Sequence, residues 1–411
     1  MIGMSEKGKS RMFRGILGLL PVLMAVGAVR GQTRSELENI RRSTALTPED
    51  FRMMGSFITR QFRSMESATA VTELNKPLLE LEGISTSTSS NIQARQQYLG
   101  EFARIIKESY NGLYQQGVNL ARQAEPAQKE LGENKKLAAA VVLVMSDHPI
   151  LIEDLKRLLS DESALVRGYA IKGFTRDNMR EQLIRGEAVG ELGGILSSLD
   201  VLLNTESSAE AIMYAAATAG LVDNTQSMAL LKKCVARRVE QYKSWQVNRE
   251  SADVEILEQV FKVANQKLAA NDRRGATDLL RSVTELYTAA YHRYRMGKAY
   301  RTAENKVVPL VTEENQQALK SLLIVGEKEF MQICNIPTNS ARMVVLVAFQ
   351  DGSEAGLPNA IDSLIGPAGK VHQTFSIYDG WAMPGELPAP SAEIIQKAVN
   401  LQKIKANAII I

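Results

Sequence analysis

The stretch LLSDESALVRGYAIKGF, residues 158–174, carries a regular apolar pattern broken by a short polar segment. Before the break, one helix face is formed by Leu151, Ile152, Leu155, Leu158 and Leu159. After it, a second face is formed by Val166, Ala170, Gly173 and Phe174, spaced i, i+4, i+7 and i+8. This spacing predicts a helix, a tight turn at SDESA and a second helix. Each helix must bury one side against a neighbour.

The pattern is similar to a HEAT or armadillo-like helical repeat. In that family an Asp closes the first helix, a Val-Arg pair follows, and a small residue comes three positions later. The corresponding residues here are Asp161, Val166, Arg167 and Ala170. The resemblance implies that Asp161 and Arg167 are structural and tie the turns of adjacent repeats. Ser163 is placed to cap the second helix.

Repetition strengthens the resemblance. Residues 199–224 repeat the pattern, because Leu199, Leu202 and Leu203 follow Leu155, Leu158 and Leu159 at an offset of 44, although the Val-Arg pair is absent. Residues 131–149 match the second helix of a preceding unit, and residues 335–366 are compatible with a degenerate later copy. The resemblance covers residues 130–225, and it implies stacked helix pairs that share one core.

Composition favours an all-α fold over the whole chain. The 411 residues are 45% hydrophobic but only 6% aromatic, and residues that form helices readily are plentiful. Five of the 49 basic and one of the 46 acidic residues lie in residues 1–31, so the remainder has a formal net charge of −1. The remainder therefore lacks the bulk positive charge that would indicate nucleic-acid binding.

Residues 1–31 have the layout of a secretory signal peptide. A basic region from Lys7 to Arg14 precedes an apolar run from Ile16 to Val29, and small residues follow. The run is shorter than the ~20 residues that span a bilayer. We therefore expect cleavage after Ala28 or Gly31 and export to the periplasm or the extracellular space. A buried first helix and a retained membrane anchor are the alternatives.

The rest of the chain divides by composition into three parts. Residues 32–90 form a helical region, in which Thr47, Pro48 and Asp50 predict a helix start and the polar GISTSTSSN (83–91) predicts a linker. Residues 91–370 form the repeat-like domain, opening with a long helix at about 91–123. Residues 371–411 provide a Pro/Gly-rich loop and a last helix at about 391–405. MVVLVAF (343–349) and TFSIY (374–378) allow strands, and hence a small mixed C-terminal subdomain.

No motif predicts catalysis, a cofactor or a metal site. His148, His292 and His372 lack partners at metal-ligand spacing. GPAGKV (366–371) lacks the first Gly and the final Ser/Thr of a phosphate-binding loop. Cys234 and Cys334 both lie in apolar, helix-like contexts, which favours free thiols over a disulfide.

One helical stretch combines tyrosines with basic residues, ELYTAAYHRYRMGKAYRTAENK (285–306). Tyr287, Tyr291 and Tyr294 share a stripe. A partner site here would use Tyr291, Arg293, Tyr294, Arg295, Lys298, Tyr300 and Arg301, because Tyr gives amphipathic contact area and Arg binds carboxylate or phosphate. The other interpretation, which the pattern favours, places the tyrosines in the core.

Together these features predict an exported, non-enzymatic helical-repeat protein that acts as a structural or protein-interaction scaffold. The first alternative is a binder of an anionic polymer through residues 287–301, either a cell-envelope glycan or a nucleic acid. The second is an enzyme of unrecognised type.

Overall fold

The fold was analysed in a computed structural model, which describes residues 31–339, 342–352 and 354–408. These residues are mostly helical, which confirms the all-α class. The predicted signal peptide lies outside the described residues except for Gly31, which begins the first helix. Within the described part, none of the helices combines the length and apolar character needed to span a membrane.

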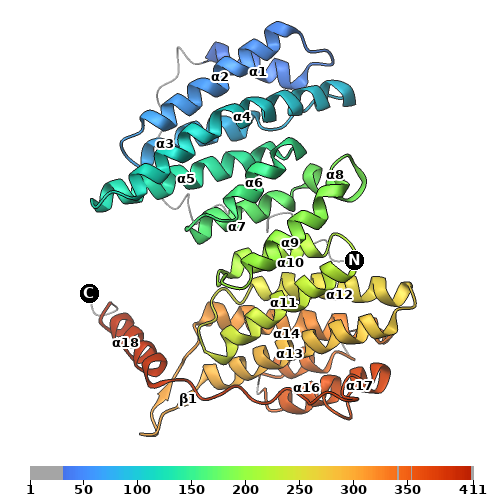
Figure 1. The fold of residues 1–411 in the computed structure, drawn as a ribbon. Helices are drawn as coiled ribbons and strands as arrows, with labels where there is room; N and C mark the ends of the chain where they lie inside the picture. The colour runs from blue at the N-terminus through green and yellow to red at the C-terminus, as the bar shows by residue number, and fades with distance from the viewer. Residues whose placement is uncertain (1–30, 340–341, 353, 409–411) are drawn as a thin grey trace.

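The N-terminal quarter contains α1 (Gly31–Arg42), α2 (Pro48–Ser67), α3 (Thr72–Ile84) and α4 (Ile92–Ala121) (Figure 1). Helix α2 starts as predicted. The Thr47 side chain accepts a hydrogen bond from the Asp50 backbone N–H, and the Asp50 carboxylate accepts from the Thr47 N–H. Pro48 takes the first helical position. This capping box satisfies two backbone donors that the first turn of a helix leaves without partners.

The middle of the chain is a run of helices joined by short turns. It contains α5 (Pro126–Ser146), η3 (Pro149–Leu151), α6 (Ile152–Leu158), α7 (Ala164–Phe174), α8 (Asp177–Arg185), η4 (Val189–Glu191), α9 (Leu192–Leu202), α10 (Ala209–Ala219) and α11 (Thr225–Lys243). The helix–turn–helix predicted at 158–174 corresponds to α6 and α7.

The C-terminal part contains α12 (Ala252–Ala269), α13 (Arg273–Lys298), β1 (Tyr300–Arg301), β2 (Val307–Val308), α14 (Glu313–Ile333), α15 (Val344–Gln350), α16 (Leu357–Ile365), α17 (Lys370–Phe375) and α18 (Ala392–Ala408). Strands β1 and β2 form one antiparallel hairpin, with Tyr300 opposite Val308 and Arg301 opposite Val307.

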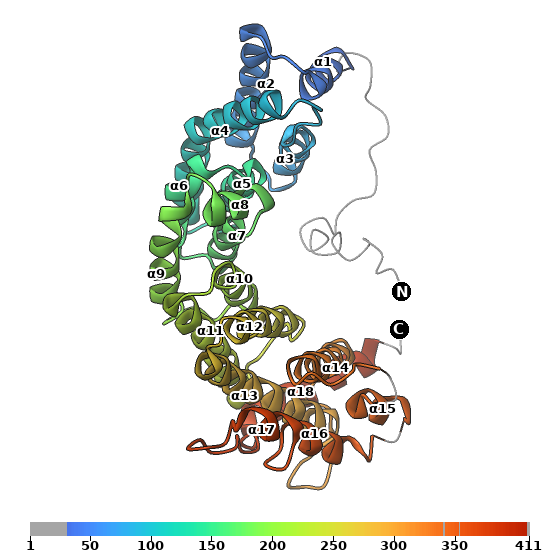
Figure 2. The same ribbon diagram turned by 90° about the vertical axis from the view of Figure 1, so that its right-hand side faces the viewer.

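The helices stack in two layers along a curved array (Figure 2). Helices α5, α7, α10, α12 and α14 contact one another in that order and form the inner layer of the curve. Helices α6, α9 and α11 lie on the outer side. Each inner helix also packs on a helix of the outer side or on the next helix in the chain. For example, α7 packs on α6, and α10 packs on α11. A long, continuous surface is therefore exposed along both sides of the array.

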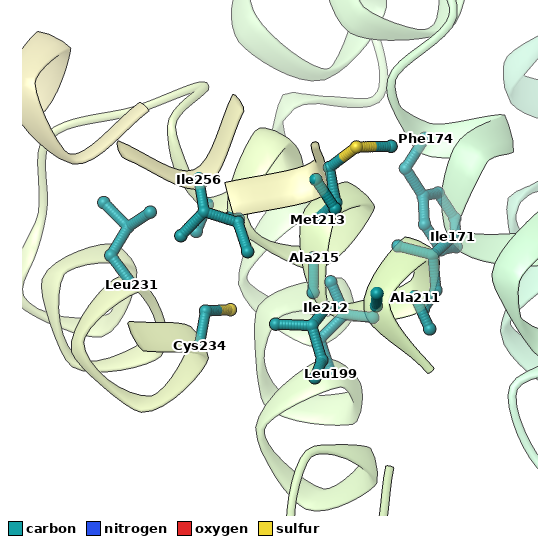
Figure 3. Packing of buried hydrophobic residues seen from close by; sticks show 14 of the residues in the cluster. Ile171, Phe174, Leu199, Ala211, Ile212, Met213, Ala215, Leu231, Cys234 and Ile256 are labelled. Carbon is teal, nitrogen blue, oxygen red and sulfur yellow. The ribbon is translucent and has the colours of Figure 1, made fainter. Parts of the chain in front are cut away.

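One apolar core runs along the array, from Leu37 to Leu387. Figure 3 shows its middle section, where Ile212 of α10 lies between Ile171 and Phe174 of α7 on one side and Ile256 of α12 on the other. Burial of such side chains stabilises the fold by roughly 1.5–3 kcal/mol each. The core is shared between neighbouring helix pairs, so a pair removed from the array would expose it.

Helices α4 and α5 make the most intimate contact of the array. A Cβ atom at Gly132 would lie 2.2 Å from the backbone nitrogen of Ala121, and one at Gly117 would lie 2.7 Å from that of Lys136. Only glycine leaves room for backbones this close. Between α6 and α7, a Cβ at Gly173 would lie 2.7 Å from a methyl group of Leu155.

One local prediction needs correction. MVVLVAF is helical as α15, and TFSIY ends α17 and continues in a turn, so neither stretch is a strand, and the two-residue β1 and β2 are the only strands among the described residues. The predicted linker at 83–91 is anchored to α1. Arg41 donates to the Thr86 carbonyl at 2.8 Å, the Thr88 N–H donates to the Arg41 carbonyl at 3.0 Å, and Ser89 is only 1% exposed. Ser89 is paired with neighbouring residues, because its hydroxyl accepts from the Asn91 N–H at 3.2 Å and its carbonyl oxygen accepts from Arg95 at 2.9 Å.

Candidate functional site

Asp161 joins three helices at the turn between α6 and α7. One carboxylate oxygen accepts from the Ser163 N–H at 2.7 Å and from Lys136 of α5 at 3.0 Å, and the other accepts from the Tyr114 hydroxyl of α4 at 2.6 Å. The Asp161 carboxylate thus caps α7, a role that the sequence suggested for the Ser163 side chain, which makes no capping bond.

Arg167 spans from its own turn to the next helix pair. Its Nη1 donates to the carbonyl oxygens of Asp161 and Glu162, both at 2.8 Å, and its Nε donates to Glu206 at 2.6 Å. The Glu206 side chain is fully buried. Val166 and Ala170 of α7 are also fully buried. The arginine therefore closes one turn and ties it to the turn between α9 and α10.

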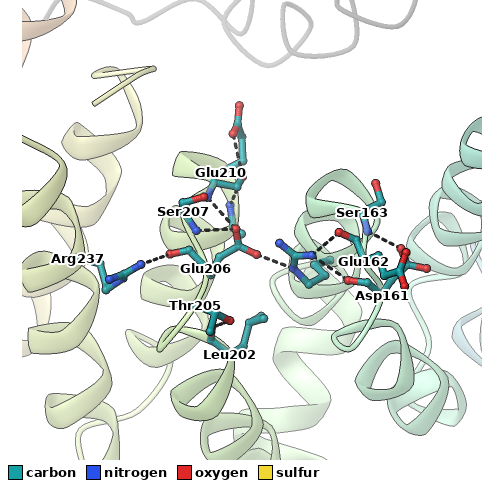
Figure 4. Close-up of polar contacts among 12 residues, drawn as sticks. Asp161, Glu162, Ser163, Leu202, Thr205, Glu206, Ser207, Glu210 and Arg237 are labelled. Atoms are coloured by element: carbon teal, nitrogen blue, oxygen red, sulfur yellow. Dashed lines mark hydrogen bonds and ion pairs between the residues drawn. The ribbon is translucent and has the colours of Figure 1, made fainter. Parts of the chain in front are cut away.

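Glu206 extends the chain of contacts to α11 (Figure 4). Its second carboxylate oxygen accepts from the N–H groups of Ser207 and Ser208, at 2.8 and 2.7 Å. Arg237 of α11 donates to the Glu206 carbonyl at 3.0 Å. We call Asp161, Arg167, Glu206 and Arg237 the turn ladder. It runs across three successive helix pairs on one edge of the array.

The turn ladder gives the register between the helix pairs α6–α7 and α9–α10. When the N-cap residues Ser163 and Ser208 are aligned, Glu206 corresponds to Asp161 at an offset of 45 residues. The leucines of the preceding helices repeat at 44, so the second turn is one residue longer. At the offset of 45 residues, Ile212 of α10 corresponds to Arg167 of α7.

The Tyr/Arg stretch of α13 lies largely inside the molecule. Tyr291 is 6%, Arg293 4% and Tyr294 5% exposed. Arg293 donates to the fully buried Glu250 at 3.1 Å and lies over the Trp245 ring at 5.3 Å. Burial raises the pKa of Glu250, although the charge of Arg293 opposes this. These positions fit the interpretation in which the tyrosines belong to the core, and they cannot contribute to a surface site.

The other predicted contact residues lie near the end of α13. Arg295 is exposed, and Lys298 is paired with Glu354 at 2.9 Å. Tyr294 donates to the same carboxylate at 2.7 Å. Tyr300 and Arg301 belong to the hairpin rather than to the helix, and Arg301 donates to Asn305 at 3.0 Å. The structure therefore separates the seven predicted residues into three that are buried and four that are exposed or partly exposed.

Neither the histidines nor the cysteines form a reactive cluster. Within the residues described, no group of three or more His, Cys, Asp and Glu side chains is placed to hold a metal ion. Cys234 on α11 and Cys334 at the end of α14 are both free thiols. Burial raises the pKa of Cys234, which suppresses its reactive thiolate form.

A groove lined by arginines lies between α2 and α4, and the sequence analysis missed it. Its volume is about 610 Å³, and its walls include Phe51, Arg52, Gly55, Ser56, Thr59, Arg60, Arg63, Glu101 and Arg104. A second groove of about 340 Å³ between α1 and α2 shares Arg52, Ser56 and Arg60 with it. We call the two together the arginine groove.

The arginines of this groove differ in their partners. Arg52 pairs with Glu49, and Arg104 pairs with Glu101 at 2.6 Å and with Glu108. The hydrogen bond from Arg104 lowers the pKa of Glu101. Arg60 and Arg63 are exposed and have no ion pair with any residue that the structure describes. The sequence did hold a signal, because Arg52, Arg60 and Arg63 lie on the face of α2 opposite its apolar stripe.

No protein-family model, curated protein or solved structure matches this chain.

Proposed function

We propose that the chain is a HEAT-like α-solenoid that is exported and works as a non-enzymatic scaffold for a protein partner. The observation that carries this proposal is the turn ladder, in which Arg167 closes its own turn and binds Glu206 of the next. A contact of this kind fixes each helix pair relative to its neighbour. Its consequence is a stiff, extended surface rather than an enclosed pocket.

The repeat assignment is supported by the shared layout of α6–α7 and α9–α10. In both pairs an acidic residue accepts from the backbone N–H of the following N-cap Ser, and small buried residues such as Ala170 and Ala215 follow on the second helix. Export is supported by the basic and apolar segments of residues 7–29.

Binding of an anionic polymer through residues 287–301 has weaker support. Tyr291 and Tyr294 are buried, so they cannot stack on a base or a sugar ring, and Lys298 is already paired with Glu354. Only Arg295, Tyr300 and Arg301 remain for such a contact. The formal net charge of residues 32–411 is also close to zero, so it adds no general attraction for a polyanion.

The proposal is tested by recovering a tagged full-length chain from its native cells after mild cross-linking, separately from the soluble, membrane and exported fractions. We expect one protein in the exported fraction to cross-link, and to bind the isolated chain when both are purified. Recovery of a glycan or nucleic acid in place of a protein, or an uncleaved N-terminus in the cytosolic fraction, would contradict the proposal.

A further inference from the structure

Helix α2 presents a continuous polar stripe to the arginine groove. The stripe follows the spacing i, i+4, i+7, i+8 and i+11, and its members are Arg52, Ser56, Thr59, Arg60 and Arg63. The opposite side of the helix is anchored in the core through Met54, Ile58, Phe62 and Met65. The guanidinium groups are therefore displayed on a rigid element rather than on a loop.

Two of the groups are available to a ligand. Arg60 and Arg63 lie one turn apart, and neither has an ion pair within the described part of the chain. Arg60 is held over the Phe57 ring at 5.3 Å. A guanidinium held in this way loses less side-chain entropy when it binds a carboxylate. Arg52 and Arg104 are already fixed by their glutamates.

The groove is not uniformly positive. Glu36, Glu49 and Glu101 line it together with the arginines, and Phe51, Met53 and Phe57 add apolar wall. A polyanion such as nucleic acid or an anionic membrane needs a continuous positive surface, and here it would meet three carboxylates. A peptide that alternates acidic and apolar side chains would meet arginine and aromatic wall in turn.

We propose that the arginine groove is the docking site for an acidic segment of the protein partner, with carboxylates of that segment paired to Arg60 and Arg63. This inference rests on the scaffold function proposed above and names where the partner binds. The hydroxyls of Ser56 and Thr59 lie on the same stripe and are placed to donate to further carboxylate or backbone oxygens.

The test uses the full-length chain and a short fluorescein-labelled peptide of repeated Glu-Glu-Leu triplets, read by fluorescence anisotropy. We expect binding that weakens as salt is raised, and no binding of the matched Gln-Gln-Leu peptide. The double variant Arg60→Gln/Arg63→Gln should bind about tenfold more weakly, since two partly exposed ion pairs are lost. Its unfolding midpoint should equal that of the parent, because both side chains are exposed.

The matched control is Arg122→Gln/Arg180→Gln, which removes the same charge from exposed arginines outside the groove. It should bind the peptide as the parent does. Equal binding by the groove variant and the parent, or equal weakening by the control, would overturn the proposal. So would binding of single-stranded DNA or phosphatidylglycerol vesicles that is lost in the groove variant while the peptide does not bind.

Binding of the purified native partner to the groove variant and to the parent distinguishes a failure of this inference from a failure of the scaffold proposal. If a purified partner binds the groove variant as tightly as the parent, the groove is rejected and the scaffold function stands. If no protein partner exists, the scaffold proposal fails, whatever the peptide does.

Discussion

Helices α2 and α13 are both long, amphipathic and rich in arginine, but Arg293 of α13 lies in an environment opposite to that of Arg60 and Arg63 of α2. On α2, Arg60 and Arg63 are exposed and unpaired among the described residues. On α13, Arg293 is buried against Glu250 and Trp245. The difference follows from the packing of each helix. One side of α2 faces solvent near the N-terminal end of the array, whereas α13 packs against α11, α12 and α14.

The contrast shows that a cluster of Tyr and Arg does not by itself identify a binding surface. Both side chains have a long apolar part and a polar end, so they suit a core with a buried partner as well as a surface. Arg293 has such a partner in Glu250, which lies 43 residues earlier and cannot be inferred from local spacing. A surface role requires that no such partner exists.

The largest expected effect is that of Arg293→Ala. It leaves the Glu250 carboxylate buried without its cation, which typically costs about 3–5 kcal/mol. The matched change on the other helix, Arg63→Ala, should alter stability by less than ~0.5 kcal/mol, as at most exposed sites. Urea unfolding of both variants checks this. Similar losses in the two variants would remove the distinction drawn between α2 and α13.

A smaller loss is expected for Arg167→Ala on α7, where the arginine is partly exposed. The variant loses hydrogen bonds to two turn carbonyls and to Glu206, for an expected cost of about 1–3 kcal/mol. Binding of the acidic peptide to the arginine groove should be unchanged at temperatures where the variant is folded. A variant that melts like the parent but loses partner binding would show that Arg167 binds the partner, the role proposed above for Arg60 and Arg63 of α2.

The smallest effect concerns the exposed end of α13. Burial tends to raise the pKa of Glu354, but the hydrogen bonds from Tyr294 and Lys298 outweigh it and lower the pKa below its ordinary value of 4.5. A lowered carboxyl pKa gives stability that is present above that value and is lost as pH falls through the folded-state pKa.

Unfolding of the parent and of Glu354→Gln should therefore be compared from neutral pH to below pH 4.5. The parent should be more stable at neutral pH, by less than ~1 kcal/mol because the site is partly exposed, and the difference should shrink on acidification. A difference that stays constant with pH would show that the ion pair contributes nothing.

Much of the helical order was predictable because it is encoded locally. Thr47, Pro48 and Asp50 fix the start of α2 through contacts within one turn, and the apolar spacing on either side of SDESA fixes α6 and α7. Contacts between distant segments were not predictable in the same way. MVVLVAF is a short apolar run with no clear period, so tertiary packing decides between strand and helix.

The candidate sites show the same limit. Arg167 could be assigned to the turn because its carbonyl acceptors lie five and six residues away, but its partner Glu206 lies 39 residues away. The arginine groove exists only because α1 and α4 pack beside α2. The arginines of α2 are visible in the sequence, whereas the wall that turns them into a groove is not.

The central claim is that the turn ladder ties successive helix pairs into one array, and a double-mutant cycle between Arg167 and Glu206 tests it most directly. Urea unfolding would be measured for Arg167→Ala, Glu206→Ala, the double variant and the parent. We expect a coupling free energy above ~1 kcal/mol, because the fully buried Glu206 and the partly exposed Arg167 form an ion pair between neighbouring turns. Additive losses, with no coupling, would contradict the claim and leave the array held by its apolar core alone.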